Sequence, residues 1–181
     1  MKHEIEKKFH IFDEEKFLST LNNYKITLGE TIRQKDKIYL RAGKNFLDLH
    51  KGEPVIRIRE EKNGFKTTLK LYKDGTLNRV EVECGITDDI AFSEYLECLG
   101  FFKIVTVDKT RREANFSGVK ILFDNISNLG KFVEFEVVTD SENTSESLKK
   151  LEQVINELGF NDDNVVKIPY DEMIYNKESK K

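Results

Sequence analysis

Charged residues alternate along the first strand-like segment in a pattern that could bind ions. Glu4, Glu6 and Lys8 are two residues apart, so in a strand their side chains project from one face. Glu134 and Glu136 repeat the acidic part of this pattern much later in the chain. Carboxylates paired in this way on two strands suit a hard divalent cation bound through oxygen, such as Mg²⁺ or Mn²⁺. The two pairs therefore indicate a metal site.

Later segments also alternate between apolar and polar residues. Residues 55–62, 65–73 and 76–85 do so, and they are separated by Asn63-Gly64 and Asp74-Gly75, dipeptides typical of two-residue hairpin turns. These segments predict an antiparallel meander of three strands. The turn length sets the register, and hence which side chains face each other.

The predicted register places Arg57, Lys70 and Arg79 side by side in one row of the meander. An alternating strand ordinarily buries its apolar face and leaves its charged face in water. Directly opposed like charges, however, destabilise a strand pair by up to about 1 kcal/mol. A bound polyanion would compensate for this cost, because arginine and lysine side chains bind phosphate oxygens. The row therefore indicates that the charged face points inward, towards an anionic ligand.

A further hairpin is predicted to turn at Ser117-Gly118, between strands at 104–116 and 119–125. This turn places Arg111 opposite Asp124, and Lys109 shares the face of Arg111. The opposite faces of the predicted strands are apolar, and they carry Ile56, Ile58, Leu69, Leu71, Val80, Val82, Cys84, Val133, Phe135 and Val137. Amphipathic helices could cover these faces from outside.

The region before the meander combines helix and strand signals. Asp13 is a good helix N-cap, and Phe12 and Phe17 have the spacing of a hydrophobic staple. A strand is predicted at 32–41 and a short extended piece at 46–50.

Three amphipathic helices are predicted, over residues 13–24, 88–99 and 144–158, with a last amphipathic turn at 170–175. About eight antiparallel strands and about three helices predict an α+β fold with a closed or nearly closed antiparallel β-barrel. Its interior would be polar, and the helices would pack outside.

The composition argues against several classes of protein. The 30 basic and 33 acidic residues give a net charge of -3, so the chain lacks the basic excess of a nucleic-acid binder. The charged N-terminus and the lack of an apolar run of membrane-spanning length predict a cytoplasmic protein without a membrane partner. Cys84 and Cys98 lack metal-ligand spacing and are predicted to be buried free thiols.

The length of 181 residues predicts one domain with a substantial core. We expect this domain to span residues 1–176 and to be followed by a disordered tail at 177–181. Apolar surface left over on the helices would favour a homodimer.

The motifs together resemble the CYTH superfamily, the triphosphate tunnel metalloenzymes. The segment Glu4-Ile5-Glu6-Lys7-Lys8 is similar to the N-terminal Glu-x-Glu-x-Lys signature of this family. The resemblance extends through Ile56-Arg57-Ile58-Arg59, Thr68-Leu69-Lys70, Arg79-Val80-Glu81-Val82-Glu83, Lys109-Thr110-Arg111-Arg112, Phe123-Asp124, and Leu129-Gly130-Lys131-Phe132-Val133-Glu134-Phe135-Glu136. It covers residues 4 to about 175, which is essentially the whole chain.

The resemblance implies a role for each matching position. Divalent metal, Mg²⁺ or Mn²⁺, would be bound by Glu4, Glu6, Asp124, Glu134 and Glu136. The triphosphate would be bound by Lys8, Arg57, Arg59, Lys70, Arg79, Lys109 and Arg111. The catalytic residues would be Glu4, Glu6, Lys8, Lys70 and Glu136.

The resemblance leaves the reaction open between two alternatives. The single-domain layout, with an insert-like segment at 41–53, looks most like the class IV adenylate cyclases, which convert ATP to 3′,5′-cyclic AMP and pyrophosphate. Other relatives are inorganic, thiamine or nucleoside triphosphatases, which release orthophosphate. In place of the Asp-x-Tyr of class IV cyclases the chain has Asp36-Lys37-Ile38-Tyr39, and Pro169-Tyr170 replaces a C-terminal Ser-Tyr. A third alternative is a module that binds a polyphosphate or nucleotide without turnover.

Overall fold

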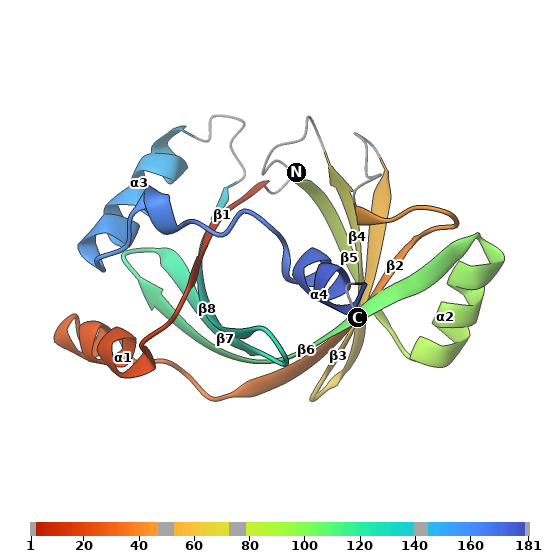
Figure 1. Ribbon diagram of the computed structural model, residues 1–181, viewed down its shortest axis with the longest axis horizontal. Helices are drawn as coiled ribbons and strands as arrows, with labels where there is room; N and C mark the ends of the chain where they lie inside the picture. The colour runs from red at the N-terminus through yellow and green to blue at the C-terminus, as the bar shows by residue number, and fades with distance from the viewer. Residues whose placement is uncertain (1–2, 47–52, 73–78, 140–144, 180–181) are drawn as a thin grey trace. The chain divides into compact units, whose positions relative to one another are not determined.

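A computed structural model describes residues 3–46, 53–72, 79–139 and 145–179 (Figure 1). Its eight strands form one sheet in the order β1-β8-β7-β6-β2-β3-β4-β5. The strands are β1 (His3–His10), β2 (Ile32–Arg41), β3 (Pro54–Glu61), β4 (Gly64–Tyr72), β5 (Arg79–Ile86), β6 (Phe101–Phe116), β7 (Val119–Ile126) and β8 (Gly130–Thr139). The helices are α1 (Glu14–Asn23), α2 (Asp89–Cys98), α3 (Ser145–Glu157) and α4 (Tyr170–Glu178), with a 3-10 turn, η2, at Asp162–Asn164.

The predicted α+β class and its eight strands are confirmed, and every pair whose register is described is antiparallel. The last predicted turn is a helix, α4, which extends to Glu178 and so covers the first two residues of the expected tail. Most of the predicted extended piece at 46–50 lies outside the described residues. No helix in the described part of the chain is long and apolar enough to cross a membrane.

The chain divides into two compact units, which we describe separately. Unit 1 comprises Met1–Ile32 and Lys109–Ile168, and unit 2 comprises Arg33–Asp108 and Pro169–Lys181. The 16-residue strand β6 contributes to both, because the boundary at Asp108 falls within it.

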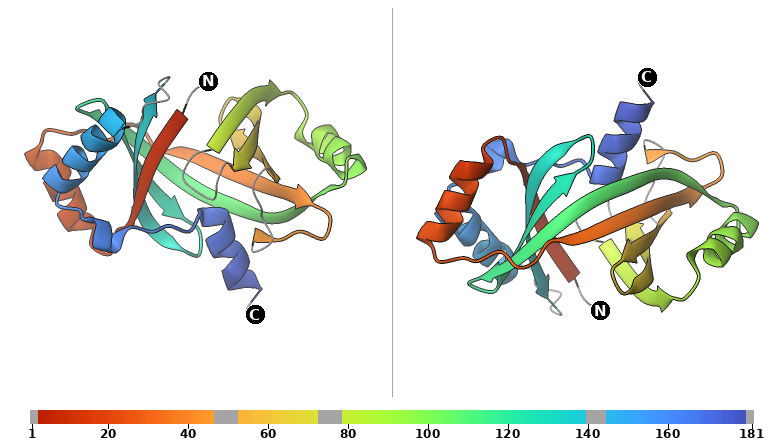
Figure 2. Two further views of the ribbon diagram at one scale, coloured as in Figure 1. Left: turned by 90° about the horizontal axis from the view of Figure 1, so that it is seen from above. Right: turned by 90° about the horizontal axis from the view of Figure 1, so that it is seen from below.

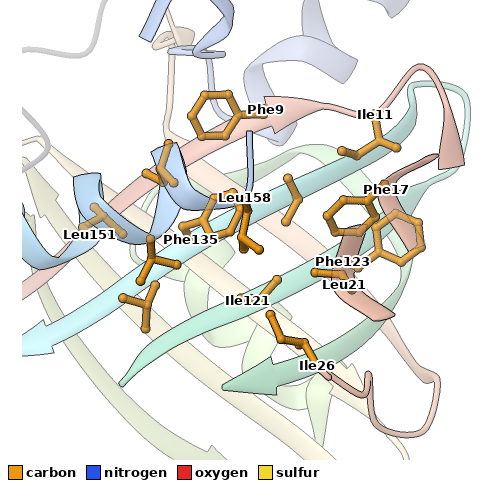
Figure 3. Close-up of a cluster of buried hydrophobic side chains, with 14 of the residues drawn as sticks. Phe9, Ile11, Phe17, Leu21, Ile26, Ile121, Phe123, Phe135, Leu151 and Leu158 are labelled. Atoms are coloured by element: carbon orange, nitrogen blue, oxygen red, sulfur yellow. The ribbon is translucent and has the colours of Figure 1, made fainter. Parts of the chain in front are cut away.

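In unit 1, helices α1 and α3 lie side by side over one face of β1, β7 and β8 (Figure 2). The core between them contains Phe9 and Phe135, both 0 % exposed, together with Leu21 and Leu151 from the two helices (Figure 3). Burying a large apolar side chain contributes about 1.5–3 kcal/mol. This core therefore anchors the apolar face of the sheet and leaves the charged face on its other side.

Helix α1 begins as predicted, because the Asp13 side chain accepts a hydrogen bond from the Lys16 amide at 2.9 Å. The predicted hydrophobic staple is wrong. Phe17 is buried against Phe123 and Phe160, whereas Phe12 is 90 % exposed and stacks on His10. Phe17 finds its apolar partners in the core, so Phe12 is left outside it.

In unit 2, helix α2 packs over strands β2 and β3. Its Leu96 is buried in a small cluster with Tyr39, Ile58 and Phe101. Our expectation that the apolar faces of all strands are covered is wrong for β5, where Val82 is 58 % exposed.

The prediction of buried cysteines is also wrong. Cys84 and Cys98 are both exposed free thiols. Cys84 shares the uncovered face of β5 with Val82, and Cys98 is the last residue of α2, where it lies outside the cluster that the helix buries.

The register of the meander differs from the prediction by two residues at each pairing. Glu61 pairs with Gly64, so the first turn consists of Lys62 and Asn63. Arg57 consequently lies opposite Thr68, and Lys70 lies opposite Glu81. The predicted row of three cations is therefore wrong. Because the shift is even, each residue keeps its predicted face.

The hairpin of β6 and β7 is as predicted. Phe116 pairs with Val119 and Arg111 with Asp124, so the turn is Ser117-Gly118. Both turn residues have positive φ, 50° and 73°, as a two-residue turn of this kind requires.

Candidate functional site

Unit 1 has a face of buried charged residues opposite its apolar core, which we call the charged face. The alternation of strands β1 and β6 to β8 places Glu4, Glu6, Lys8, Lys109, Arg111, Lys120, Asp124, Glu134 and Glu136 on this face. Lys8, Lys109, Arg111, Asp124, Glu134 and Glu136 are between 0 % and 8 % exposed. The prediction that these charges are buried is confirmed.

The centre of the charged face is a network around Arg111. Its Nε donates to Asp124 Oδ1 at 2.6 Å, and its Nη2 donates to Asp124 Oδ2 at 2.5 Å and to Glu134 Oε2 at 2.7 Å. Lys109 Nζ lies 3.4 Å from Asp124 Oδ2, and Lys8 Nζ lies 3.9 Å from Glu134 Oε1. Charge-assisted bonds of this kind are short and directional. The bonds from Arg111 hold its guanidinium against Asp124 and Glu134, and the two lysines lie at longer distance from the same carboxylates.

A second group of carboxylates lies further along the same face. Glu6 and Glu136 are direct partners in the pairing of β1 with β8, and Glu4 is two residues from Glu6 on the same face. Lys120 Nζ contacts Glu136 Oε1 at 3.4 Å from the neighbouring strand β7. Like charges directly opposed on a sheet are destabilising, and a cation bound between them removes this penalty.

These carboxylates fit the chemistry of a divalent metal site. Glu4, Glu6 and Glu136 supply the oxygen donors that Mg²⁺ and Mn²⁺ prefer. Across residues 3–46, 53–72, 79–139 and 145–179, no three acidic, histidine or cysteine side chains already converge as a finished metal site.

The structure gives Asp124 and Glu134 different surroundings from the other three acids. Asp124 is 0 % exposed, and both of its oxygens contact Arg111. Glu134 contacts Arg111 and Lys8. Both contact the buried Arg111, whereas the described cation beside Glu136 is Lys120, so Asp124 and Glu134 are placed to orient Arg111. Their role as metal ligands stays a prediction.

Unit 2 positions the basic residues predicted on β3 and β4. Arg59 donates two hydrogen bonds of 2.7 Å to Asp36 on β2, one to each carboxylate oxygen. Arg57 donates to the Thr68 hydroxyl at 2.9 Å, and Lys70 Nζ lies 2.8 Å from Glu81 Oε1. Each of these cations therefore has an oxygen partner from a neighbouring strand.

Arg57 is the least compensated of these cations. Burial lowers the pKa of its guanidinium from the usual value, and the nearby charge of Arg59 lowers it further, while Asp36, Glu81 and Glu83 act in the opposite direction. Its Nε is buried without a hydrogen-bond partner among the described residues. An anionic ligand would supply both the missing charge and the missing acceptor.

One predicted residue and one missed residue complete the description of unit 2. The side chain of Arg79 lies outside the described part of the structure, although its backbone pairs with Tyr72. Asp36, absent from our predicted site, is 5 % exposed and clamps Arg59. The signal was its match to the first position of Asp-x-Tyr, together with its even spacing from Gln34 and Ile38 on the inward face of β2.

Comparisons with known proteins identify the family of the chain. The family model described as the CYTH domain matches residues 2–170. The chain belongs to the CYTH family. Its fold is the predicted one, the eight-stranded triphosphate tunnel fold of that family, whose enzymes generally use divalent metals and act on triphosphates.

Several CYTH relatives resemble the chain over nearly its whole length. A protein of Methanocaldococcus jannaschii named as a candidate adenylate cyclase is 24% identical over 173 residues, which cover 94% of this chain and 97% of that protein. A solved structure of a conserved protein from Pyrococcus furiosus is 28% identical, with a TM-score of 0.76 over 93% of this chain and 98% of that one.

A plant protein has the same fold and a second activity in its description. The structure of a candidate adenylyl cyclase from Hippeastrum, described as having a dominant triphosphatase activity, has a TM-score of 0.61 at 13% identity and covers 99% of this chain and 96% of that one. At this identity the likeness concerns the fold alone.

Proposed function

We propose that this CYTH-family protein is a divalent-metal-dependent enzyme that converts ATP to 3′,5′-cyclic AMP and pyrophosphate. The observation that carries the proposal is the juxtaposition, on the charged face of unit 1, of the Glu6–Glu136 pair with the cations Lys8, Lys109 and Arg111. The name of the Methanocaldococcus relative supports the choice of reaction.

The charge balance of this face indicates why a metal is needed. Five buried or half-buried acids (Glu4, Glu6, Asp124, Glu134 and Glu136) outnumber three buried bases (Lys8, Lys109 and Arg111), and the exposed Lys120 and Glu113 add one charge of each sign. Such a face repels a polyanion. A divalent ion held by Glu4, Glu6 and Glu136 reverses the sign and leaves the cations able to attract a triphosphate.

In the proposed reaction, the ribose 3′-hydroxyl oxygen bonds to the α-phosphorus of ATP while the bond from that phosphorus to the bridging oxygen of pyrophosphate breaks. When bound, the metal offsets negative charge on the phosphoryl oxygens and on the leaving group. Lys8, Lys109 and Arg111 do the same, and the short bonds that hold Arg111 in place reduce the reorganisation needed during the reaction. A glutamate of the Glu6–Glu136 pair orients the hydroxyl and accepts its proton.

The cations of unit 2 are assigned to the same substrate class. Arg57, Arg59 and Lys70 match the triphosphate-binding positions of the family, and the under-compensated charge of Arg57 favours an anionic ligand. The pairing of Arg59 with Asp36 would hold its guanidinium in one orientation for phosphate.

A triphosphatase is the second candidate, favoured by the activity named for the Hippeastrum relative. In this reaction water attacks the terminal phosphorus and orthophosphate leaves. The same carboxylates and cations could serve it, because only the phosphorus that meets the nucleophile differs.

Product analysis separates these functions. The protein is incubated with ATP, inorganic triphosphate or thiamine triphosphate in Mg²⁺ or Mn²⁺, and the products are identified by chromatography. We expect cyclic AMP and pyrophosphate from ATP. Orthophosphate would instead establish the triphosphatase, and binding without any product would establish a non-catalytic module.

A matched pair of variants connects the product to the site. Glu136→Gln should abolish turnover, whereas Glu113→Gln should leave it unchanged. The exposed Glu113 lies on the same face of β6 as Arg111, and strand β7 separates β6 from β8, which carries Glu136. Equal activity of both variants would contradict the assignment of the metal site.

A further inference from the structure

Arg57 and Arg59 lie on the same face of β3, yet their surroundings differ. On the side of β2, Arg59 is paired with Asp36, which accepts two hydrogen bonds from its guanidinium, whereas Arg57 is paired with Ile38. The side chain of Ile38 has no polar atom. One arginine therefore has a carboxylate beside it, and the other has an apolar side chain.

On the side of β4, Arg57 is paired with Thr68. Arg57 Nη2 donates to the Thr68 hydroxyl at 2.9 Å, and that hydroxyl donates to Glu83 Oε2 on β5 at 3.4 Å. A threonine hydroxyl has one hydrogen to donate and two lone pairs that can accept. Because Glu83 receives the hydrogen, a lone pair faces Arg57, and the row Arg57, Thr68 and Glu83 crosses three strands.

Thr68 holds the guanidinium of Arg57 without neutralising it. Among the residues that the structure describes, its hydroxyl is the one group that accepts a hydrogen bond from Arg57. Glu83, the carboxylate with which Arg57 forms an ion pair, lies farther away, 3.9 Å from Nη2. A neutral hydroxyl fixes the orientation of a guanidinium but leaves its charge, which a carboxylate at hydrogen-bond distance would offset.

The two side chains also differ in access to a ligand. The Arg57 side chain is 14 % exposed, whereas Thr68 is 1 % exposed. A ligand on this face of β3 and β4 would therefore meet the arginine and not the threonine. Thr68 can act on such a ligand only through Arg57.

We infer that Thr68 is the positioning residue of Arg57, which it orients towards a phosphate group of the substrate while leaving the positive charge of the guanidinium uncompensated. This inference rests on the proposed function, since it takes Arg57 as a triphosphate-binding residue. It also gives the two arginines of β3 different roles. Arg57 supplies net positive charge to the anion, and Arg59, offset by Asp36, supplies N–H donors in a fixed direction.

Thr67 provides a matched control for Thr68. The two residues are adjacent on β4 and both are buried, but Thr67 is paired with Ile58 on the opposite face of the sheet. Replacing either threonine by valine keeps the branched shape and removes the hydroxyl.

Isothermal titration calorimetry in Mg²⁺ measures the Kd of α,β-methylene ATP, which cannot release pyrophosphate. We expect Thr68→Val to raise this Kd about tenfold, the size expected when a hydrogen bond to a charged group is lost. Thr67→Val should leave it within about twofold. Thr68→Ser keeps the hydroxyl and should bind the analogue within about twofold of wild type.

A double-variant cycle tests whether Thr68 acts through Arg57. Arg57→Met should weaken binding by itself, and adding Thr68→Val to it should change the Kd by less than about twofold. A threonine needed only for the structure of β4 would weaken binding by the same factor in both backgrounds. Thermal unfolding shows whether each variant is folded. If Thr68→Val does not fold, Thr68→Cys replaces it in the cycle, because a thiol is a weak acceptor.

The possible failures are distinguishable. If wild-type protein binds the analogue but Thr68→Val binds it as tightly as Thr67→Val, or if the effect of the Thr68 variant persists in Arg57→Met, the positioning role is wrong and the proposed function stands. If wild-type protein in Mg²⁺ does not bind the analogue, the proposed function is wrong and the positioning role is overturned with it.

Discussion

Glu6 and Glu136 are direct partners across strands β1 and β8, so their two carboxylates lie side by side on the charged face. We expect Mg²⁺ or Mn²⁺ to bind there and to stabilise the folded protein by about 2.7 kcal/mol when the ion is present at 100 times its Kd. Thermal unfolding with and without metal measures this effect. Glu6→Gln and Glu136→Gln should abolish the stabilisation. An undiminished shift in both variants would show that the ion binds elsewhere.

Asp124 should contribute to stability through Arg111, because it is fully buried and receives two hydrogen bonds from the guanidinium. Asp124→Asn leaves a buried arginine poorly paired, and we expect it to lower the free energy of unfolding by about 3 kcal/mol. Urea denaturation measures the loss. The double variant Asp124→Leu with Arg111→Met should lose less than the sum of its two single variants. Strict additivity would contradict the pairing.

Variants of Lys70 and Glu81 distinguish a loss of stability from a loss of triphosphate binding. The two residues are opposite each other in the observed register, and Lys70 Nζ lies 2.8 Å from Glu81 Oε1. Lys70→Met should lower stability by about 0.5 kcal/mol and weaken triphosphate binding. Glu81→Gln breaks the same ion pair but keeps the cation, so it should cost similar stability without weakening binding. A Lys70→Met protein more stable than wild type would contradict the Lys70–Glu81 pair and favour the originally predicted row of Arg57, Lys70 and Arg79.

Asp108 should make stability depend on acid pH through Arg33. The hydrogen bonds from Arg33 hold the pKa of the Asp108 carboxyl below its usual value, with partial burial acting in the opposite direction. A carboxyl whose pKa is depressed on folding stabilises the protein above its unfolded pKa, about 3.9, and loses this contribution as the pH falls through the folded value. Asp108→Asn should therefore be less stable than wild type at pH 7.

The Arg33–Asp108 ion pair also predicts the pH range in which wild type and Asp108→Asn become equally stable. Urea denaturation of wild type and Asp108→Asn should give curves that converge as the pH falls through the depressed pKa of Asp108 in the folded protein, because both side chains are then uncharged. A gap that persists at that pH would mean that lost packing, and not the ion pair, causes the change. Arg33 is largely exposed, so added salt should also reduce the gap at pH 7.

Much of the charged face could be predicted from residue spacing alone. Period-two alternation assigned Glu4, Glu6, Lys8, Glu134 and Glu136 to one side of their strands, and the structure places them there. The turn at Ser117-Gly118 likewise predicted the Arg111–Asp124 pair. Alternation is a local property of the backbone, so it can be read without knowing the fold.

Register and helix coverage were harder to predict. In the first hairpin of the meander, moving the turn by one residue shifts every pairing by two, which preserved the faces but replaced the predicted Arg57–Lys70–Arg79 row with pairs of opposite or neutral partners. The exposure of Val82 depends on which strands α2 covers. The exposure of Phe12 depends on Phe17, which packs in the core of unit 1 and not against Phe12. These outcomes are decided by contacts distant in the chain.

The family, the strand faces and the set of acids and bases could be read directly from the chain, because motif spacing and alternation are properties of short segments. How those charges are paired could be seen only in the folded protein. Asp124 orients Arg111, Asp36 clamps Arg59, and Glu6 meets Glu136, since each of these contacts joins different strands of the sheet. The roles of the charges follow from these partners, which strand pairing brings together and which the order of residues along the chain does not specify.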